Sequence, residues 1–416
     1  MQSTANEKPR RDHLVEVLRF WACAIVACHH FACEFFPKAE FGSSTSFVLA
    51  DHPGYAVGRD LSRSFIFDLF NAGSFAVCLF FILSGYILVK PYFAQSELQW
   101  TSLSGDAFKR IVRLGMPLVI AIFICFLCME FGWFQNYGQS VAPFSGSGWA
   151  IGFFHDPAFG KQMIWRSLSQ PFAYGLDFLP PTWTINVELI GSYLSYGLVG
   201  MMHSSPLAWL MGIAAIYLAP AYYKCFAVGV LCAYAEKHAP VRLRARWQKI
   251  KSSPLFHVVG LFLLSGALYL AAYPGQQVPV QDLEGTIFEP LNRFKQICDS
   301  ALDLPGTAIP SASGLFVITK LWYDDLRLLD FLAPLGKFTY VVYLAHFIVL
   351  GTTVSWAFLW LQHSFPDTRI CLMLTFAYYA LCLSCCCALT KYIDGSAIAL
   401  SHKLKSYYLK SLSRNS

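Results

Sequence analysis

The sequence predicts an all-α protein, a polytopic transmembrane bundle of about ten helices with both termini in the cytoplasm. Three observations support this fold class. Of the 416 residues, 56% are hydrophobic and only 13% are charged, whereas a soluble protein carries about 25% charged residues. Apolar segments long enough to cross a bilayer recur along the chain. Cations gather in alternate loops between these segments, as expected of cytoplasmic loops.

The individual spans follow from apolar runs of about 17–25 residues. The fifth and sixth runs are short, and Asp324, Asp325 and Arg327 interrupt the eighth. Residues 141–182 are rich in glycine, proline and aromatic side chains, so we expect them to lie in the interface or re-enter the membrane. The predicted spans are 14–36, 65–89, 114–134, 183–203, 207–220, 222–236, 255–273, 311–331, 338–361 and 369–393.

The charge pattern sets the orientation and the domain limits. With an even number of spans the termini share one side, and that side receives most of the cations. We therefore expect a cytoplasmic tail over 1–13, one transmembrane domain over 14–395 and a basic cytoplasmic tail over 396–416. The net charge of +6 is explained by these loops and does not favour nucleic acid as a partner. The clustered cations are Lys8, Arg10, Arg11, Lys109, Arg110, Arg113, the run Lys237 to Lys251, Lys403, Lys405, Lys410 and Arg414.

Two local patterns have alternative interpretations. The basic N-terminus followed by an apolar run resembles a signal peptide, and Ile25 to Cys28 fits a lipoprotein cleavage box. The run continues to Phe36 and further spans follow, so we interpret it as an uncleaved first span. Most of the fourteen cysteines lie in apolar segments, where they are expected to act as small buried apolar residues. Cys298, in a predicted outer loop, has no obvious partner, and no structural metal site is predicted.

Arg19 and His30 are the most informative pair in the first span. Eleven positions correspond to about three helical turns, so both side chains lie on one face, about 16 Å apart. Ionisable groups at that depth cost about 2.5–3.5 kcal/mol each. Histidine suits a general base. The alternative is a structural histidine bonded to a carbonyl, with Arg19 extending to the interface. His29 points about 100° away and is a lesser candidate.

Arg110 and Arg113 precede the third predicted span. At a spacing of i, i+3 they share a helix face and could clamp phosphate oxygens. Ordinary anchoring at the cytoplasmic interface is the alternative explanation.

The segment Trp183 to Glu188 opens the fourth span. Asn186 and Glu188 enter the membrane with no cation within one turn, so the carboxylate needs a partner on another helix. Arg19 and His30 are the candidates. A structural hydrogen bond between helices is the alternative.

A tyrosine and a histidine share a face in the ninth span. Tyr343 and His346 are separated by i, i+3, either in a reaction centre or in a hydrogen bond that only fixes packing. Ser84 and Gly85 are expected to permit close helix packing rather than to supply a nucleophile.

Taken together and in this order, these segments resemble the acyltransferase-3 family of integral membrane acyltransferases. The resemblance covers about residues 11–395. The doubled histidine of His29-His30-Phe31 is similar to the branch common in fungi and some bacteria. Two positions depart from the family pattern: Thr339 replaces a serine, and no proline follows Asp394. The matching segments are Arg19 to His30, Phe80 to Tyr86, Arg110-x-x-Arg113, Thr182 to Glu188 and Leu335 to His346.

The resemblance implies an enzyme that moves an acyl group, commonly acetyl, from a coenzyme A thioester to a hydroxyl of a carbohydrate, lipid or small molecule. It implies acyl-coenzyme A as a co-substrate, with no permanently bound cofactor or metal. We expect Arg110 and Arg113 to hold coenzyme A phosphates. His30, assisted by Glu188, would act as base or transient acyl carrier, and Arg19 or a tyrosine would stabilise the oxyanion. Supporting roles are expected for His29, Trp183, Asn186, Tyr343 and His346.

Three other functions remain open from the residues. A proton-coupled transporter could use Arg19, His30, Glu188 and His346 as a relay, although no internal repeat is visible. A multispanning acyltransferase of the class that uses a buried histidine and asparagine could use His346 and Asn186. A relative without catalytic activity is the third. The acceptor pocket would be assembled from the outer loops 36–64, 135–182 and 274–310.

Overall fold

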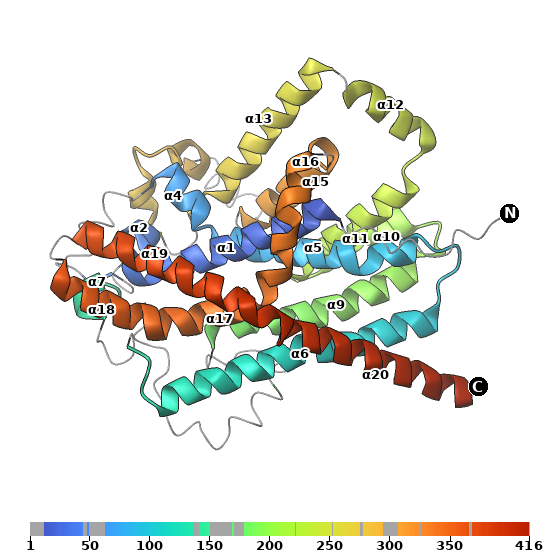
Figure 1. Cartoon of the computed structure of the whole chain (residues 1–416). Helices are drawn as coiled ribbons and strands as arrows, with labels where there is room; N and C mark the ends of the chain where they lie inside the picture. Colours follow the sequence, from blue (N-terminus) through green and yellow to red (C-terminus); the bar gives the residue numbers. More distant parts are fainter. Residues whose placement is uncertain are drawn as a thin grey trace.

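The chain is helical throughout the part that the structure, a computed structural model, describes. β pairing in that part is limited to an isolated antiparallel bridge between Val48 and Ser147. Figure 1 shows most helices running side by side as an elongated bundle, with α12 and α13 projecting from it. The described residues are 12–44, 48–49, 63–135, 141–149, 169, 179–220, 222–251, 253–274, 278–293, 307–324, 326–365 and 368–415.

The all-α prediction is confirmed for these residues. Short 3-10 or π segments join several helices, so that α16 to α18 and α19 to α20 each follow without a break along the chain. The α-helices are α1 (His13–Phe35), α2 (Pro37–Phe41), α4 (Phe65–Phe70), α5 (Gly73–Phe93), α6 (Trp100–Glu130), α7 (Ala142–Ser145), α9 (Trp183–Met202), α10 (Ala208–Leu218), α11 (Tyr223–His238), α12 (Val241–Lys251), α13 (Pro254–Ala271), α15 (Ala308–Trp322), α16 (Arg327–Leu332), α17 (Thr339–Val349), α18 (Ser355–Ser364), α19 (Thr368–Cys386) and α20 (Asp394–Asn415).

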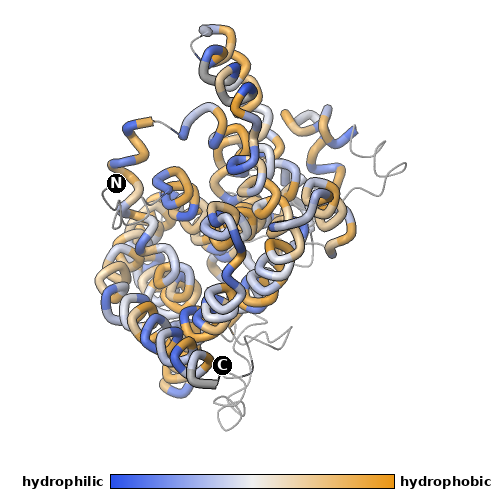
Figure 2. Tube along the Cα trace, turned by 90° about the vertical axis from the view of Figure 1, so that its right-hand side faces the viewer, coloured by the Kyte–Doolittle hydropathy of each residue, from blue (hydrophilic) through white to orange (hydrophobic). Residues whose placement is uncertain are grey.

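Among the residues that the structure describes, six helical stretches are long and apolar enough to cross a membrane, and α10 and α15 are shorter apolar helices. The count of about ten spans and the cytoplasmic placement of both termini stay predictions. Figure 2 views many of the helices end-on, with hydrophobic residues on each. The six stretches are His13–Phe35, Gly73–Phe93, Trp100–Glu130, Pro254–Ala271, Arg327–Ser364 and Thr368–Ser413.

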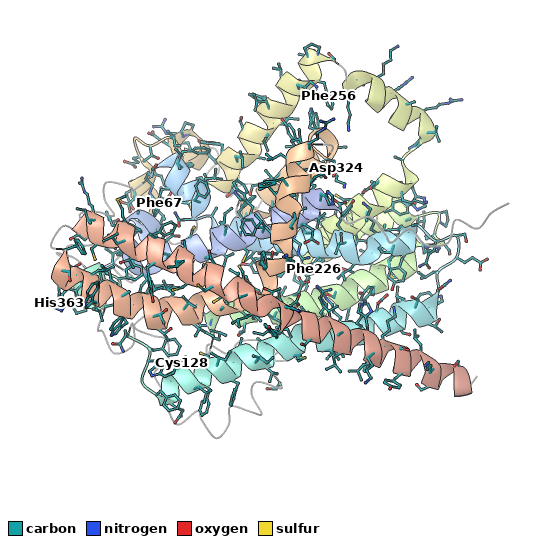
Figure 3. The ribbon with its side chains drawn as sticks, viewed as in Figure 1. Phe67, Cys128, Phe226, Phe256, Asp324 and His363 are labelled. Atoms are coloured by element: carbon teal, nitrogen blue, oxygen red, sulfur yellow. The ribbon has the colours of Figure 1, made fainter. Side chains whose placement is uncertain are left out.

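Exposed apolar side chains mark the surfaces that lipid would cover. On α13, Leu255 is 69% and Phe262 is 77% exposed, and Figure 3 shows Phe256 on this projecting arm. A large apolar surface is stable in lipid but costly in water. The exposed faces therefore agree with a membrane environment.

Three predicted spans have different limits in the structure. The second divides at Asn71 into α4 and α5, and Asn71 caps α4 by donating a backbone hydrogen bond to Phe67. The third begins earlier, at Trp100, because the basic segment continues the helix. The eighth breaks after Trp322, next to the acidic residues that interrupt the apolar pattern. Residues 1–11, 150–168 and 170–178, together with Cys298 and Asp325, lie outside the described residues.

Helices α5 and α11 pack closely in the core, and small residues permit this approach. A Cβ on Gly85 would collide with the backbone of Phe226, and one on Gly229 would collide with the backbone of α5 at Ile82. Phe226 lies in the middle of the bundle in Figure 3 and is buried. The expected packing role of Gly85 is therefore confirmed.

An ionic network holds the start of α1. Asp12 caps the helix by accepting from the backbone N–H of Val15 at 3.4 Å, and its other oxygen contacts Lys320 at 2.7 Å and Lys90 at 3.1 Å. Burial alone would raise the pKa of Asp12, but the two ammonium groups outweigh it and lower this pKa. The network joins α1 to α5 and α15.

The C-terminal helix packs along the segment that carries the predicted arginine pair. Lys405 on α20 contacts Asp106 on α6 at 2.7 Å, and the rings of Phe108 and Tyr408 stack at 5.3 Å. Figure 1 shows α6 and α20 crossing the lower side of the bundle. These contacts hold the N-terminal half of α6 against α20.

Candidate active site

Five helices line a pocket in the bundle. It has a volume of about 80 Å³ and is lined from α1, α5, α6, α9 and α17. All the charged lining residues, and Tyr343, were selected from the sequence, whereas Ser84, Thr184, Thr339 and Tyr340 were not. The phenylalanine rings of α5 form an apolar wall. The lining residues are Arg19, Val77, Phe80, Phe81, Ser84, Arg110, Arg113, Leu114, Thr184, Ile185, Glu188, Thr339, Tyr340 and Tyr343.

Glu188 forms an ion pair with Arg110 on one wall of this pocket. Nη2 of Arg110 donates to Oε1 of the carboxylate, and its Nε donates to the Ser192 hydroxyl at 3.0 Å. Both charged side chains are nearly buried, at 13% and 12% exposure. The expectation that Glu188 would pair with Arg19 or His30 is therefore wrong. The pair couples α6 to α9, because the basic segment before the third span is helical and reaches the depth of the carboxylate.

Arg19 and Arg113 bring two further cations to the same space. Nη1 of Arg19 lies 3.8 Å from Oε1 of Glu16, one turn earlier on α1. Both guanidiniums interact electrostatically with Asp394 at the start of α20. Tyr340 donates its hydroxyl to the Leu114 carbonyl at 2.6 Å and so fixes α17 against α6. Three arginines therefore converge on one pocket.

His30 pairs with His346 beyond the pocket. Nδ1 of His30 lies 2.7 Å from Nε2 of His346, and Nδ1 of His346 lies 2.6 Å from the Tyr343 carbonyl. A carbonyl only accepts, so His346 carries its proton on Nδ1 and its neutral Nε2 is an acceptor. His30 must then donate from Nδ1, which leaves Nε2 of His30 as the basic nitrogen. These hydrogen bonds orient the ring of His30 in the same way as the ring of a histidine base in a catalytic relay.

Aromatic side chains fix the ring of His30. Trp149 stacks on it at 5.5 Å and Phe347 meets it edge-on at 5.4 Å. His30 contacts His346 on α17, and Arg19 lines a pocket that α17 also lines, so both residues lie on the side of α1 that faces α17, as the spacing predicted. His30 itself is not among the residues that line the pocket.

Tyr343 connects the pocket with the histidine pair. Its hydroxyl shares a hydrogen bond of 2.7 Å with Thr184 and lies 3.3 Å from the Pro181 carbonyl. Its own carbonyl holds His346. Tyr343 therefore links the start of α9 to the pair of His30 and His346.

The remaining predicted residues lie around this centre. Trp183 packs on Tyr222 at 5.2 Å rather than on the histidines. Asn186 is buried on α9. His29 turns to another side of α1, where Nδ1 lies 3.0 Å from both Glu40 and the Asn71 carbonyl. The sequence analysis did not select Glu40 or Cys33; the spacing i, i+4 of His29 and Cys33 was the available signal.

Comparison with known proteins decides the family. A model of the acyltransferase-3 family, described as an acyltransferase domain, matches residues 12–391, nearly the whole chain. The chain belongs to this family. It is therefore an integral, multi-pass membrane acyltransferase, an enzyme that transfers groups other than amino-acyl groups. No curated protein and no solved structure matches the chain. The branch with the doubled histidine stays a prediction.

Proposed function

We propose that this acyltransferase moves an acyl group, in the simplest form acetyl, from a coenzyme A thioester to a hydroxyl of a carbohydrate, a lipid or a small molecule. One observation carries the proposal: Arg19, Arg110 and Arg113 converge with Glu188 on a single pocket with apolar walls. Three guanidiniums suit a donor rich in phosphate, and the phenylalanine rings suit its uncharged arm.

The donor would bind with its phosphates on α6, and we assign the N-terminal end of this helix to the cytoplasmic side. Phosphate oxygens would compete with Glu188 for Arg110, while Arg113 presents a second guanidinium one turn away. Arg19, about three turns from His30 along α1, would stabilise the oxyanion that forms when the thioester is attacked.

His30 would receive the proton of the acceptor hydroxyl on Nε2. The hydrogen bonds from Tyr343 through His346 fix the tautomer that leaves this nitrogen basic. His346 is in this proposal the positioning residue, in place of Glu188. Direct attack by the activated hydroxyl and a transient acyl-histidine are both compatible with this geometry.

Incubation of membranes with radiolabelled acetyl-coenzyme A tests the proposal. We expect label on a hydroxyl-bearing product, identified by mass spectrometry, and a loss of about 10²–10⁴-fold in His30→Ala, the range of general base catalysis. His257→Ala, an exposed histidine on α13, is the matched control. Equal labelling in His30→Ala and wild type would remove His30 from the mechanism.

The arginine pair has its own readout. We expect Arg113→Gln to raise KM for acetyl-coenzyme A more than it lowers kcat, because it removes a contact to the part of the donor that does not react. Arg246→Gln, an exposed cation on α12, controls for net charge. An unchanged KM in Arg113→Gln would place the donor phosphates elsewhere.

A further inference from the structure

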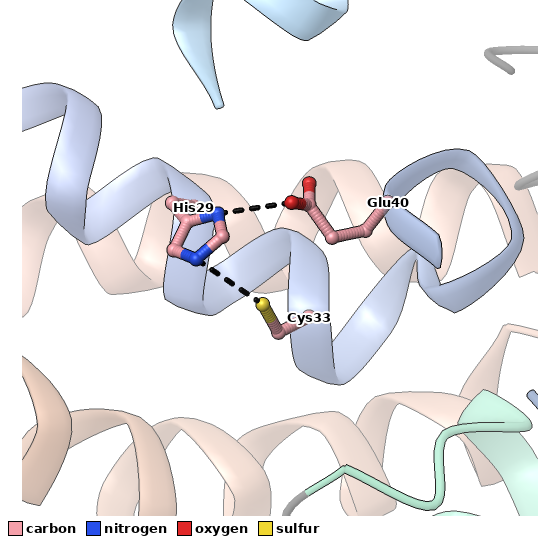
Figure 4. A group of neighbouring side chains, drawn as sticks. All are labelled: His29, Cys33 and Glu40. Atoms are coloured by element: carbon pink, nitrogen blue, oxygen red, sulfur yellow. Dashed lines mark hydrogen bonds and ion pairs between the residues drawn. The ribbon is translucent and has the colours of Figure 1, made fainter. Parts of the chain in front are cut away.

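A second group of reactive side chains lies on α1 next to the histidine pair. The ring of His29 stands between Cys33 on the same helix and Glu40 on α2, as Figure 4 shows. Nε2 of His29 lies 3.8 Å from the Cys33 sulfur, and Nδ1 lies 3.0 Å from Oε1 of Glu40. Cys33 is 1% exposed, while the side chain of His29 is 28% exposed.

Hydrogen bonding fixes which nitrogen faces the thiol as a base. Nδ1 of His29 meets two acceptors, the Glu40 carboxylate and the Asn71 carbonyl, each at 3.0 Å. Neither group donates, so Nδ1 carries the hydrogen, and the lone pair of neutral Nε2 points to the sulfur of Cys33. A carboxylate, an imidazole and a thiol in this order are the parts of an activated cysteine nucleophile.

A metal ion fits the same three residues less well. A metal would need the thiolate and the carboxylate beside one nitrogen, at about 2.0–2.3 Å from the ion. Here they contact opposite nitrogens of the ring (Figure 4). The arrangement therefore favours proton transfer between the three groups over chelation.

The surroundings place this thiol beside the proposed acceptor base. Cys33 follows His29 by four residues and His30 by three, so it shares a helix face with each in turn. The rings of His29 and His30 are 5.3 Å apart, and Trp149, which stacks on His30, also packs against the cluster that contains Cys33. The ring of His29 fits because residue 73 is a glycine, where a Cβ would collide with it.

We propose that Cys33 is a covalent acyl carrier, activated by His29 with Glu40 as the positioning residue, and that it holds the acyl group before its transfer to the hydroxyl. This inference rests on the proposed function. Nε2 of His29 takes the thiol proton while the Cys33 sulfur attacks the carbonyl carbon of the donor thioester. The donor carbon–sulfur bond breaks, and the coenzyme A sulfur leaves with the proton from His29.

The second half of the reaction returns the enzyme to its first state. The acceptor hydroxyl, losing its proton to Nε2 of His30, attacks the carbonyl of acyl-Cys33. The carbon–sulfur bond breaks and the product ester leaves. The proton that His30 received passes to the Cys33 thiolate, so that the thiol and the neutral imidazole are both restored. Each step exchanges one acyl bond for another, with no oxidant or reductant.

Intact-protein and peptide mass spectrometry tests the carrier. The full-length protein in detergent, given acetyl-coenzyme A without acceptor, should carry acetyl on Cys33 that hydroxylamine removes. We expect no such adduct in Cys33→Ala and an unchanged adduct in Cys28→Ala, the matched control on the same helix. If wild type transfers label to an acceptor while Cys33→Ala transfers equally well, the proposed function stands and the carrier is refuted. If wild type transfers label to no acceptor and carries no adduct, both are refuted.

Thiol alkylation gives a readout that needs no acyl donor. With iodoacetamide, we expect Cys33 to react at least about tenfold more slowly in His29→Gln than in wild type, because the base is lost. The rate at Cys28 should not change. Glu40→Gln keeps the imidazole and serves as a second variant in case His29→Gln does not fold. Alkylation of Cys33 should also be slower in Glu40→Gln than in wild type. Equal rates at Cys33 in wild type and both variants, or one zinc per chain that Cys33→Ala loses, would overturn the inference.

Discussion

Glu188→Gln removes the charge of the ion pair with Arg110 while keeping the size of the side chain and an oxygen acceptor. Both partners are nearly buried, at 12% and 13% exposure, so the guanidinium would lose its counter-charge in a place that water reaches poorly. Breaking a buried pair in this way costs about 3–5 kcal/mol. Two unit charges in contact at an effective dielectric constant of about 20 give about 4 kcal/mol, which agrees with that range.

A double-mutant cycle separates this charge interaction from packing. Glu188→Gln and Arg110→Gln should each lower the free energy of unfolding in mixed micelles by about 3 kcal/mol. The double variant should lose less than the sum, since neither residue then leaves a buried charge unpaired. Distant sites add within about 0.3–0.5 kcal/mol. A coupling energy inside that limit would refute the pairing and the wall of the pocket derived from it.

Three further predictions concern packing and pH. Gly85→Val should destabilise the protein by at least about 1–3 kcal/mol, because its Cβ meets the Phe226 backbone, whereas Gly197→Ala, which meets no atom within 4 Å, should not; equal melting temperatures would contradict this. Tyr343→Phe should cost about 1 kcal/mol of unfolding free energy for its lost hydroxyl bonds, and a loss of activity without loss of stability would instead assign the hydroxyl to chemistry. Asp12→Asn should be less stable than wild type at neutral pH. The pKa of Asp12 is lower in the folded than in the unfolded state, so its carboxylate stabilises the wild type above the unfolded-state pKa, and this stabilisation is lost as the pH falls through the folded-state pKa. The difference in stability between wild type and Asp12→Asn should therefore shrink below about pH 4. A difference that does not depend on pH would contradict the network.

The sequence predicted the helical class and most of the pocket because local constraints decide both. Long apolar runs fix helices, and cations inside or beside them must face the interior or the interface. Arg19, Arg110, Arg113, Glu188 and Tyr343 therefore entered one pocket as the ordered motifs indicated.

The partners of these groups could not be predicted, because they depend on how distant helices pack. His30 and His346 are separated by 316 positions, and nothing local distinguishes His346 from Glu188 as the partner of His30. Glu188 pairs with Arg110 because α6 begins well before the apolar run and so places Arg110 on the same helix. The contact of Glu40 with His29 could not be predicted, because Glu40 lies on a separate five-residue helix, α2, that turns back toward His29.

The pairing of α20 with α6 has a practical consequence for work on this enzyme. Lys405 and Tyr408 contact the turn just before Arg110, at Asp106 and Phe108. A large fusion at the C-terminus, or a truncation that removes α20, is expected to disturb the segment of α6 that carries Arg110 and Arg113. Purification handles therefore belong at the other end of the chain.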